Sequence, residues 1–294
     1  DTTDVIIGYS WWPELMRQIK RRRPKVGVHV RTINAEALQH LIRDPQPWTR
    51  PIAKLRTYYG AIRLARRDRQ CAQIADAVLG ISPWDDQHYW KRIAPRRYTH
   101  LPYFSPWPHL QIAADANDAA QRRHWSQRHN RLVCMPGGGD SISQQQRRLF
   151  ADVATVAATI DSCSEIEFQM TRGVHRRDED EIPQDLPYER IDCEDPWDLL
   201  LQSRAVGIFT DMGYGFKTTI ADGIAAGCHV IVHRGLIPRV PESLHDALIE
   251  IDPGNKHSIE SALQRIVTPP RNDGVHERLK RAAERVLGEV TGGR

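Results

Sequence analysis

The sequence predicts an α/β protein built from two doubly wound, Rossmann-like domains. Short apolar runs alternate with amphipathic stretches along most of the chain, which is the pattern of parallel strands joined by helices. Several apolar runs end in glycine-bearing loops, as strands do when they lead into ligand-binding helices. A polar stretch that begins with prolines interrupts the alternation and divides the chain into two such series.

The first series predicts an N-terminal domain over residues 1–104. It opens with a strand at 5–8 and a helix that ends at Pro24, because proline breaks the helical hydrogen-bond pattern. After a strand at 26–30, Asn34 is expected to cap the next helix. The remaining elements are a long basic helix to about residue 75, strands at 77–81 and 98–104, and a helix that begins near 83.

The stretch 105–130 predicts the connection between the domains, because its polar, alanine-rich part has no wide apolar stripe. The C-terminal domain then covers 131–294. Its first strand, 132–135, runs into a loop of three glycines and a helix at 143–160 with one apolar stripe. Further strands are expected at 166–170, 188–191, 205–209, 229–232 and 247–251, and further helices at 196–203, from 255 and at 275–290.

Composition narrows the class of protein. The chain has 294 residues, and its 40% hydrophobic and 27% charged content is ordinary for a globular protein. No apolar run approaches the roughly 18 residues of a membrane span. The five cysteines are far apart and have no metal-binding spacing, so they predict core thiols of a cytoplasmic protein rather than zinc ligands or disulfides.

The net charge of +4 is unevenly distributed. Residues 1–104 carry 19 Lys and Arg against 9 Asp and Glu (+10), and the remainder carries 22 against 28 (−6). One interpretation is that arginine-rich helix faces are simply solvated. The other is that the front half contacts an anionic surface, such as phospholipid headgroups, a lipid-phosphate acceptor or an acidic polysaccharide.

The segment Gly213–Gly227 carries the clearest functional signal. A buried strand precedes it, a glycine-bearing loop leads into a helix, and another buried strand follows. Backbone N–H groups at Gly215 and Phe216, the positive helix end and Lys217 would all face one anion, with Thr218 beside them. Asp222 lies further along this apolar helix, and a pair of ribose hydroxyls would satisfy it. Together they predict a nucleotide diphosphate site.

Two other loops are expected at the same edge of the sheet. The strand at 132–135 leads to Gly137, Gly138 and Gly139, and the strand at 166–170 leads to Arg172. The carboxyl ends of parallel strands meet along one edge, so a bound ligand would contact all three loops. The alternative is structural: each glycine makes a tight turn, each cation is a surface charge, and Asp222 forms a salt bridge.

The segment YGFKTTIADGIAAG, from Tyr214, resembles the signature of the retaining GT-B glycosyltransferases of group 1 (family four). When the shared Ala-Ala-Gly is aligned, the family's second acid falls on Asp222, which the resemblance places on the donor ribose. The first acid, which contacts the sugar ring in the family, falls on Tyr214. Lys217 stands where the family has a small residue. Segments 74–82, 101–104 and 251–253 also resemble the family.

The resemblance implies two GT-B domains with a cleft between them, and a front domain that is incomplete compared with the family. It implies sugar transfer from a UDP-, GDP- or dTDP-sugar to a hydroxyl of a glycan, a lipid-linked or a small-molecule acceptor, with no cofactor and no required metal. Peripheral contact with the inner face of the membrane fits the basic half, and nucleic acid is not expected. An inverting reaction would need a base, for which His29, Glu36 and Asp4 are candidates; retention and inversion stay open.

Two other functions remain compatible with the sequence. A nucleotide-sugar 2-epimerase would use the same scaffold without an acceptor. A non-catalytic protein that binds nucleotides or anionic surfaces would tolerate the loss of the acid at Tyr214. Release of free nucleotide diphosphate only when an acceptor is supplied would favour transfer over both.

Overall fold

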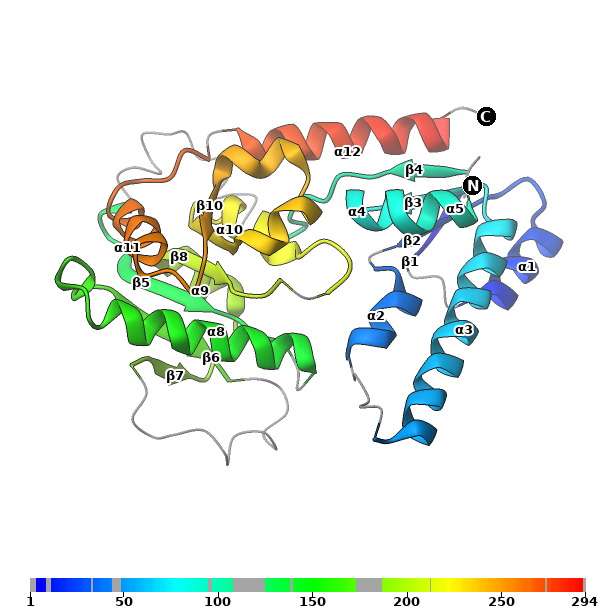
Figure 1. Cartoon of the computed structure of the whole chain (residues 1–294). Helices are drawn as coiled ribbons and strands as arrows, with labels where there is room; N and C mark the ends of the chain where they lie inside the picture. Colours follow the sequence, from blue (N-terminus) through cyan, green and yellow to red (C-terminus); the bar gives the residue numbers. More distant parts are fainter. Residues whose placement is uncertain are drawn as a thin grey trace.

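Two parallel β-sheets with helices around them make up the structure, which is a computed structural model (Figure 1). Both sheets follow from strands that the apolar runs predict. The N-terminal sheet contains β1 to β4 and the C-terminal sheet contains β5 to β10. The structure describes residues 4–8, 12–32, 34–43, 49–94, 97–107, 125–137, 140–172, 187–211, 213–272 and 274–292.

The N-terminal sheet has four parallel strands in sequence order. Parallel neighbours need crossover connections, and here every crossover is helical. The strands are β1 (Asp4–Gly8), β2 (Gly27–Thr32), β3 (Ala77–Gly80) and β4 (Tyr98–His100); the connections contain α1 (Pro13–Arg22), α2 (Glu36–Arg43), α3 (Pro51–Ile74), α4 (Pro83–Asp85), η1 (Asp86–Trp90) and α5 (Lys91–Ile93).

The two faces of this sheet bury different partners, because successive strand residues point to opposite faces. On one face, Val28 and Val30 form a core with Met16 of α1 and Cys71 of α3. On the other face, Leu79 packs against the last helix, α12 (Val275–Gly292). α12 reaches from the C-terminal sheet to this face (Figure 1). α12 therefore contributes to the cores of both domains, although the expected boundaries, 1–104 and 131–294, assign it to the C-terminal domain alone.

The C-terminal sheet is doubly wound, with the strand order β10-β9-β8-β5-β6-β7 and parallel pairing throughout. The chain moves outward from β5 to β7, returns to the centre and moves outward again from β8 to β10. The strands are β5 (His129–Cys134), β6 (Glu167–Thr171), β7 (Glu189–Ile191), β8 (Ser203–Ile208), β9 (His229–His233) and β10 (Leu248–Ile251); the helices are α8 (Ser141–Ala157), α9 (Pro196–Gln202), α10 (Thr218–Ala225) and α11 (Lys256–Gln264), with the short turns η2 (Asp161–Cys163), η4 (Arg234–Arg239), η5 (Glu242–Ala247) and η6 (Arg265–Val267).

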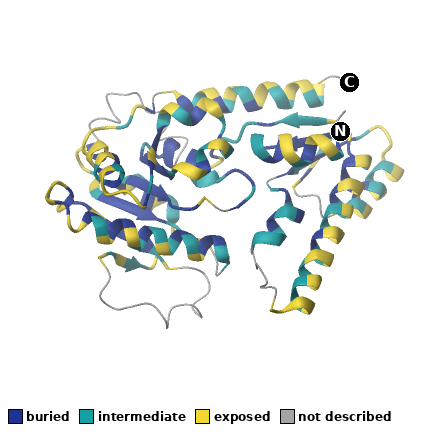
Figure 2. Cartoon of the chain, in the orientation of Figure 1, coloured by how far each residue is buried: buried dark blue, intermediate teal, exposed yellow. Residues whose placement is uncertain are grey.

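Helices cover both faces of the C-terminal sheet, and its central strands are buried on both sides (Figure 2). Phe150 of α8 and Leu263 of α11 belong to the core of one face. Leu200 of α9 and Ile220 of α10 belong to the core of the other. This two-sided burial explains why the strands are continuous apolar runs rather than alternating ones. The predicted α/β fold class is confirmed.

Most predicted elements lie within a few residues of the observed ones, and one local prediction is wrong. α2 begins at Glu36, so Asn34 is not its cap; the backbone carbonyl of Ala35 accepts the first helical hydrogen bonds instead. The predicted connection, 105–130, is described only at its ends. Near its start, Trp107 stacks on Trp197 of α9, with ring centroids 4.7 Å apart. Over the described residues, no helix is long and apolar enough to cross a membrane.

Gly223 lets α10 approach the sheet closely, which gives a testable expectation for stability. A Cβ atom at Gly223 would lie 2.6 Å from Val206 and 3.0 Å from Val230, both fully buried. Gly223→Ala should therefore lower the free energy of unfolding by about 1–3 kcal/mol in urea titrations, because the close-packed core must shift. Gly288→Ala is the matched control: Gly288 is an exposed glycine of α12 with open space around it, and alanine there should stabilise by about 0.5–1 kcal/mol. Equal signs for both variants would contradict this account.

Candidate functional site

A cavity of about 360 Å³ lies between the two domains. It lies at the carboxyl ends of β5 and β8, where the strand order of the C-terminal sheet reverses. Crossovers on either side of such a switch point leave to opposite faces, so the strand ends there form a natural crevice. The lining comprises Asn34 and Gln39 of the N-terminal domain, Met135, Gly137, Asp140, Ile142, Ser143 and Gln146 around the start of α8, and Ile208, Tyr214, Phe216, Lys217, Thr218 and Thr219 around the start of α10.

The loop before α10 depends on two glycines. Gly213 has φ +113° and Gly215 has φ +82°, a region that residues with a Cβ rarely adopt. This backbone buries Phe216 and begins α10 at Thr218, at the cavity wall. Lys217 stands at the N-cap position and gives no side-chain cap. The N–H of Ile220 donates to the Lys217 carbonyl at 2.9 Å, whereas Thr218 and Thr219 line the cavity beside the lysine, so this helix start is suited to an anion.

The start of α8 differs, because it already holds a carboxylate. Asp140 caps this helix and accepts a hydrogen bond from the N–H of Ser143 at 2.9 Å. A second anion is therefore disfavoured there, and the start of α10 is the more attractive of the two. Gly137 lines the cavity, and a Cβ on it would lie 3.4 Å from the Ser143 hydroxyl. Gly138 and Gly139 lie outside the described residues.

Asp222 lies one helical turn beyond Thr218, is only 2% exposed and does not line the cavity. The Tyr103 hydroxyl donates to its Oδ1 at 3.5 Å, and the Ser105 side chain forms a second hydrogen bond. Burial raises the pKa of Asp222 to about 6, although both hydrogen bonds oppose this shift. The pKa of the Tyr103 hydroxyl is also raised, by burial and by the negative charge of Asp222. Asp222 is therefore a desolvated acid that additional hydroxyl donors would stabilise.

The N-terminal domain holds the glycine loop from the opposite side of the cavity. The N–H of Tyr214 donates to Oε1 of Gln39 at 2.9 Å. The Asp85 carboxylate accepts the N–H of Ala35 at 2.9 Å and a further backbone hydrogen bond from Gly215. Burial raises the pKa of Asp85, and these two bonds oppose the increase. The loop that shapes the anion site is thus fixed by both domains.

Aromatic and cationic side chains complete this contact between the domains. The ring of Tyr214 lies 5.3 Å from that of Trp84. The Arg239 guanidinium lies 5.6 Å from the Trp84 ring centroid and donates to the carbonyl of Gly213. Tyr214 occupies the position where the resemblance places an acid, and here it packs between domains. We call Gln39, Asp85, Trp84 and Arg239 the loop clamp.

Two other predicted site residues differ in their relation to the cavity. Arg172 does not line it: the guanidinium pairs with Asp192 at 3.5 Å beside β7, and both side chains are exposed. Glu36 lies in the first turn of α2 and accepts a hydrogen bond from the side chain of Asn34, a lining residue, at 3.4 Å. Glu36 is therefore next to the cavity, whereas Arg172 serves a surface ion pair.

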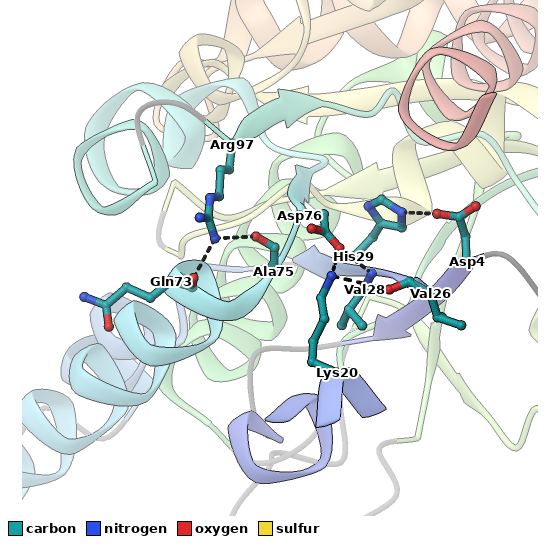
Figure 3. Close-up of polar contacts among 9 residues, drawn as sticks. All are labelled: Asp4, Lys20, Val26, Val28, His29, Gln73, Ala75, Asp76 and Arg97. Atoms are coloured by element: carbon teal, nitrogen blue, oxygen red, sulfur yellow. Dashed lines mark hydrogen bonds and ion pairs between the residues drawn. The ribbon is translucent and has the colours of Figure 1, made fainter. Parts of the chain in front are cut away.

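His29 lies away from the cavity, at the opposite end of the N-terminal sheet. Its register partner is Ala77, the first residue of β3, and its Nε2 contacts Oδ1 of Asp4 at 2.8 Å (Figure 3). The imidazole is 1% exposed. Asp76, also at these amino ends, accepts the N–H of Val28 at 2.8 Å (Figure 3). This placement gives His29 and Asp4 a structural role and does not support the expected role as a base.

Several residues that the sequence did not single out belong to the site: Gln39, Trp84, Asp85, Tyr103, Ser105 and Arg239. A signal for one group was present, because Trp84 and Asp85 belong to α4, the helix that follows the carboxyl end of strand β3. Gln39 and Arg239 carried no signal, since they reach the loop from distant segments. In the described part of the chain, no three His, Cys, Asp or Glu side chains gather as metal ligands would.

Solved structures resemble this arrangement over almost the whole chain. The α,α-trehalose 6-phosphate synthase of Burkholderia multivorans matches 98% of this chain and 70% of its own, with 11% identity and a TM-score of 0.58. A trehalose-6-phosphate structure from E. coli, bound with UDP-2-fluoro glucose, matches 99% and 74%, with 11% identity and a TM-score of 0.58. The chain has the GT-B fold.

A third similar structure, TarM, matches 99% of this chain and 52% of its own, with 11% identity and a TM-score of 0.57. No protein-family model and no curated protein matches the chain. The predicted resemblance to GT-B proteins is thus confirmed at the level of the fold. At these identities the likeness concerns the fold, so the chemistry has to be argued from the residues of the cavity.

Proposed function

We propose that this protein transfers a sugar from a nucleotide diphosphate donor to an acceptor hydroxyl. The observation that carries the proposal is the cavity between the domains, with the start of α10 and Lys217 on its wall. Asp222 lies one turn beyond, buried behind the lining residues. A diphosphate fits the first two features, because both favour negative charge. Ribose hydroxyls fit Asp222, because a buried carboxylate gains from hydroxyl donors. The GT-B fold supports the same assignment.

In this proposal the protein stabilises the leaving group electrostatically. When the sugar departs, negative charge grows on the diphosphate beside Lys217 and the helix N-terminus, which are already oriented before the reaction. The donor is a UDP-, GDP- or dTDP-sugar, and the acceptor is a glycan, a lipid-linked or a small-molecule hydroxyl. Two solved GT-B structures contain UDP-2-fluoro glucose and glucose-6-phosphate, respectively, which supports both substrate classes. Neither a cofactor nor a metal ion is part of the proposal.

The acceptor is proposed to enter from the N-terminal side of the cavity. Glu36 is retained as the nearby acid–base candidate, since its partner Asn34 lines the cavity. The protein is proposed to act in the cytoplasm, with peripheral contact between its basic N-terminal half and the inner face of the membrane. This contact agrees with the net charge of +10 over residues 1–104.

Nucleotide diphosphates should stabilise the protein. At a concentration of about 100 times the dissociation constant, the matching nucleotide should raise the free energy of unfolding by about 2.7 kcal/mol, measured as a thermal shift. UDP, GDP and dTDP are compared with the corresponding nucleosides, which lack the diphosphate. If no nucleotide diphosphate shifts the transition, the donor site is wrongly assigned. The nucleotide sugar that binds is then incubated with and without an acceptor. Release of nucleotide diphosphate only in the presence of the acceptor indicates sugar transfer and argues against 2-epimerisation.

A further inference from the structure

Helix α3 exposes a stripe of large apolar side chains. Ile52, Leu55, Tyr59 and Ile62 follow one another at spacings of three and four residues, which places them on one face of the helix. Each is between 52% and 70% exposed. The amino-terminal half of α3 extends away from the N-terminal sheet, and its exposed positions are visible there (Figure 2). Water contact at four such side chains is unfavourable, so this face is suited to an apolar partner.

The same face becomes basic toward the carboxyl end of α3. Arg66 and Arg69 continue the line of the stripe, and Arg63 lies beside it; all three are exposed. Asp68 is the only acidic residue in α3, and it is 1% exposed and accepts a hydrogen bond from the Tyr89 hydroxyl. The outer face of α3 therefore combines aliphatic and aromatic groups with arginines and presents no carboxylate.

This combination of charges and apolar groups selects among partners. A symmetric dimer centred on the stripe would cover the apolar side chains but would give the arginines no anionic partner, because this face of α3 carries no carboxylate. Nucleic acid would pair with the arginines but would leave Ile52, Leu55 and Ile62 unsatisfied, since its interfaces are strongly polar. The boundary of an anionic bilayer satisfies both groups, because acyl chains accept apolar side chains and phosphates accept guanidinium groups.

We propose that α3 is a docking helix for an anionic phospholipid membrane. Ile52, Leu55, Tyr59 and Ile62 insert at the level of the headgroups, and the arginines bind lipid phosphates. This proposal assigns the peripheral membrane contact of the proposed function to one helix. Only its consequence for the acceptor rests on the proposed function. Helix α2 packs along α3, and Gln39 of α2 lines the cavity. When α3 docks on the membrane, only α2 therefore separates it from the side of the cavity where the acceptor is proposed to enter. A lipid-linked acceptor would suit this geometry.

Vesicle sedimentation of the whole chain tests the proposal. The protein should pellet at low salt with vesicles of equal parts phosphatidylcholine and phosphatidylglycerol, and remain in solution with pure phosphatidylcholine. Leu55→Ser with Ile62→Ser should weaken the partition by about tenfold or more, because two inserted side chains are lost. Arg63→Gln with Arg66→Gln should weaken it and reduce its dependence on salt.

Two control variants remove similar groups elsewhere. Val267→Ser replaces an apolar side chain that is 58% exposed in the C-terminal domain, and Arg285→Gln replaces an exposed arginine of α12. Both should pellet like the wild type. Equal loss in the α3 variants and the controls, or no pelleting of the wild type, would overturn the proposal. It would also be overturned if the Leu55 and Ile62 variant abolished a dimer in light scattering while vesicle binding stayed the same.

The thermal shift with nucleotide diphosphates separates this proposal from the proposed function. The α3 variants should keep the full shift, which also shows that they are folded. Vesicle binding without any nucleotide shift would contradict the donor site and leave the docking helix supported. A nucleotide shift without vesicle binding would contradict the docking helix alone.

Discussion

Asp222→Asn is expected to stabilise the unliganded protein at pH 7 and to weaken donor binding. Burial is the main cause that raises the pKa of Asp222 to about 6 from the ordinary value of 3.8 for an aspartate. Between these pH values the folded protein holds a proton that the unfolded chain has lost, so the free energy of unfolding falls as pH rises from about 4 to about 6. Asparagine removes this loss, which is about 3 kcal/mol at pH 7.

In the proposed function, the same substitution replaces a charged acceptor of the ribose hydroxyls by a neutral one. Nucleotide diphosphate affinity should therefore fall by about tenfold or more. Urea titrations between pH 4 and pH 8, with and without nucleotide, measure both effects. Asp152→Asn is the control, since Asp152 is exposed on α8 and should change neither quantity. A variant that is less stable at pH 7, or that binds nucleotide as tightly as the wild type, would contradict the assignment of Asp222.

Lys217→Ala is expected to weaken binding of nucleotide diphosphates while leaving nucleoside binding almost unchanged. Lys217 lines the cavity, and its Nζ lies 3.2 Å from the position of a Cβ on Gly213, so the ammonium sits over the glycine loop. Its loss removes one charge-assisted contact to the phosphates, which predicts a decrease in affinity of about 10- to 100-fold at low salt. The decrease should shrink as salt is added, because salt screens a partly exposed charge.

Calorimetric titration with the nucleotide and its nucleoside makes this comparison. Lys256→Ala is the matched control, because Lys256 begins α11 and contacts Thr159 rather than the cavity. An equal loss for nucleoside and nucleotide would indicate damage to the loop instead of a lost phosphate contact. An unchanged affinity for both would place the diphosphate elsewhere.

The strands and helices were predictable because each depends on local signals. Strands such as β8 (Ser203–Ile208) are largely buried on both faces and therefore appear as continuous apolar runs. Gly213 and Gly215 predicted the loop before α10, and they adopt positive φ angles there, which glycine tolerates best. From these residues and the alternation of elements, the fold class and the position of Lys217 at a helix start followed directly.

The contacts between distant segments were not predictable in the same way. The sequence shows only that Tyr214 stands where the family has an acid. In the structure, Tyr214 contacts Gln39 and Trp84, which belong to the N-terminal domain. The partner of His29 is Asp4, which only the register of β1 on β2 brings near. Such pairs depend on the packing of whole elements, and no spacing within one segment reveals them.

The loop clamp makes the anion site a property shared by both domains. Gln39 and Asp85 bind the backbone of the glycine loop at Tyr214 and Gly215, so contact between the domains helps to fix the conformation of the loop. In the proposed function, donor affinity and domain contact are then thermodynamically coupled, and the coupling is reciprocal. Whatever strengthens the contact between the domains tightens the donor, and a bound donor strengthens that contact by the same factor. An acceptor that touches both domains would therefore be bound cooperatively with the nucleotide, even without touching it.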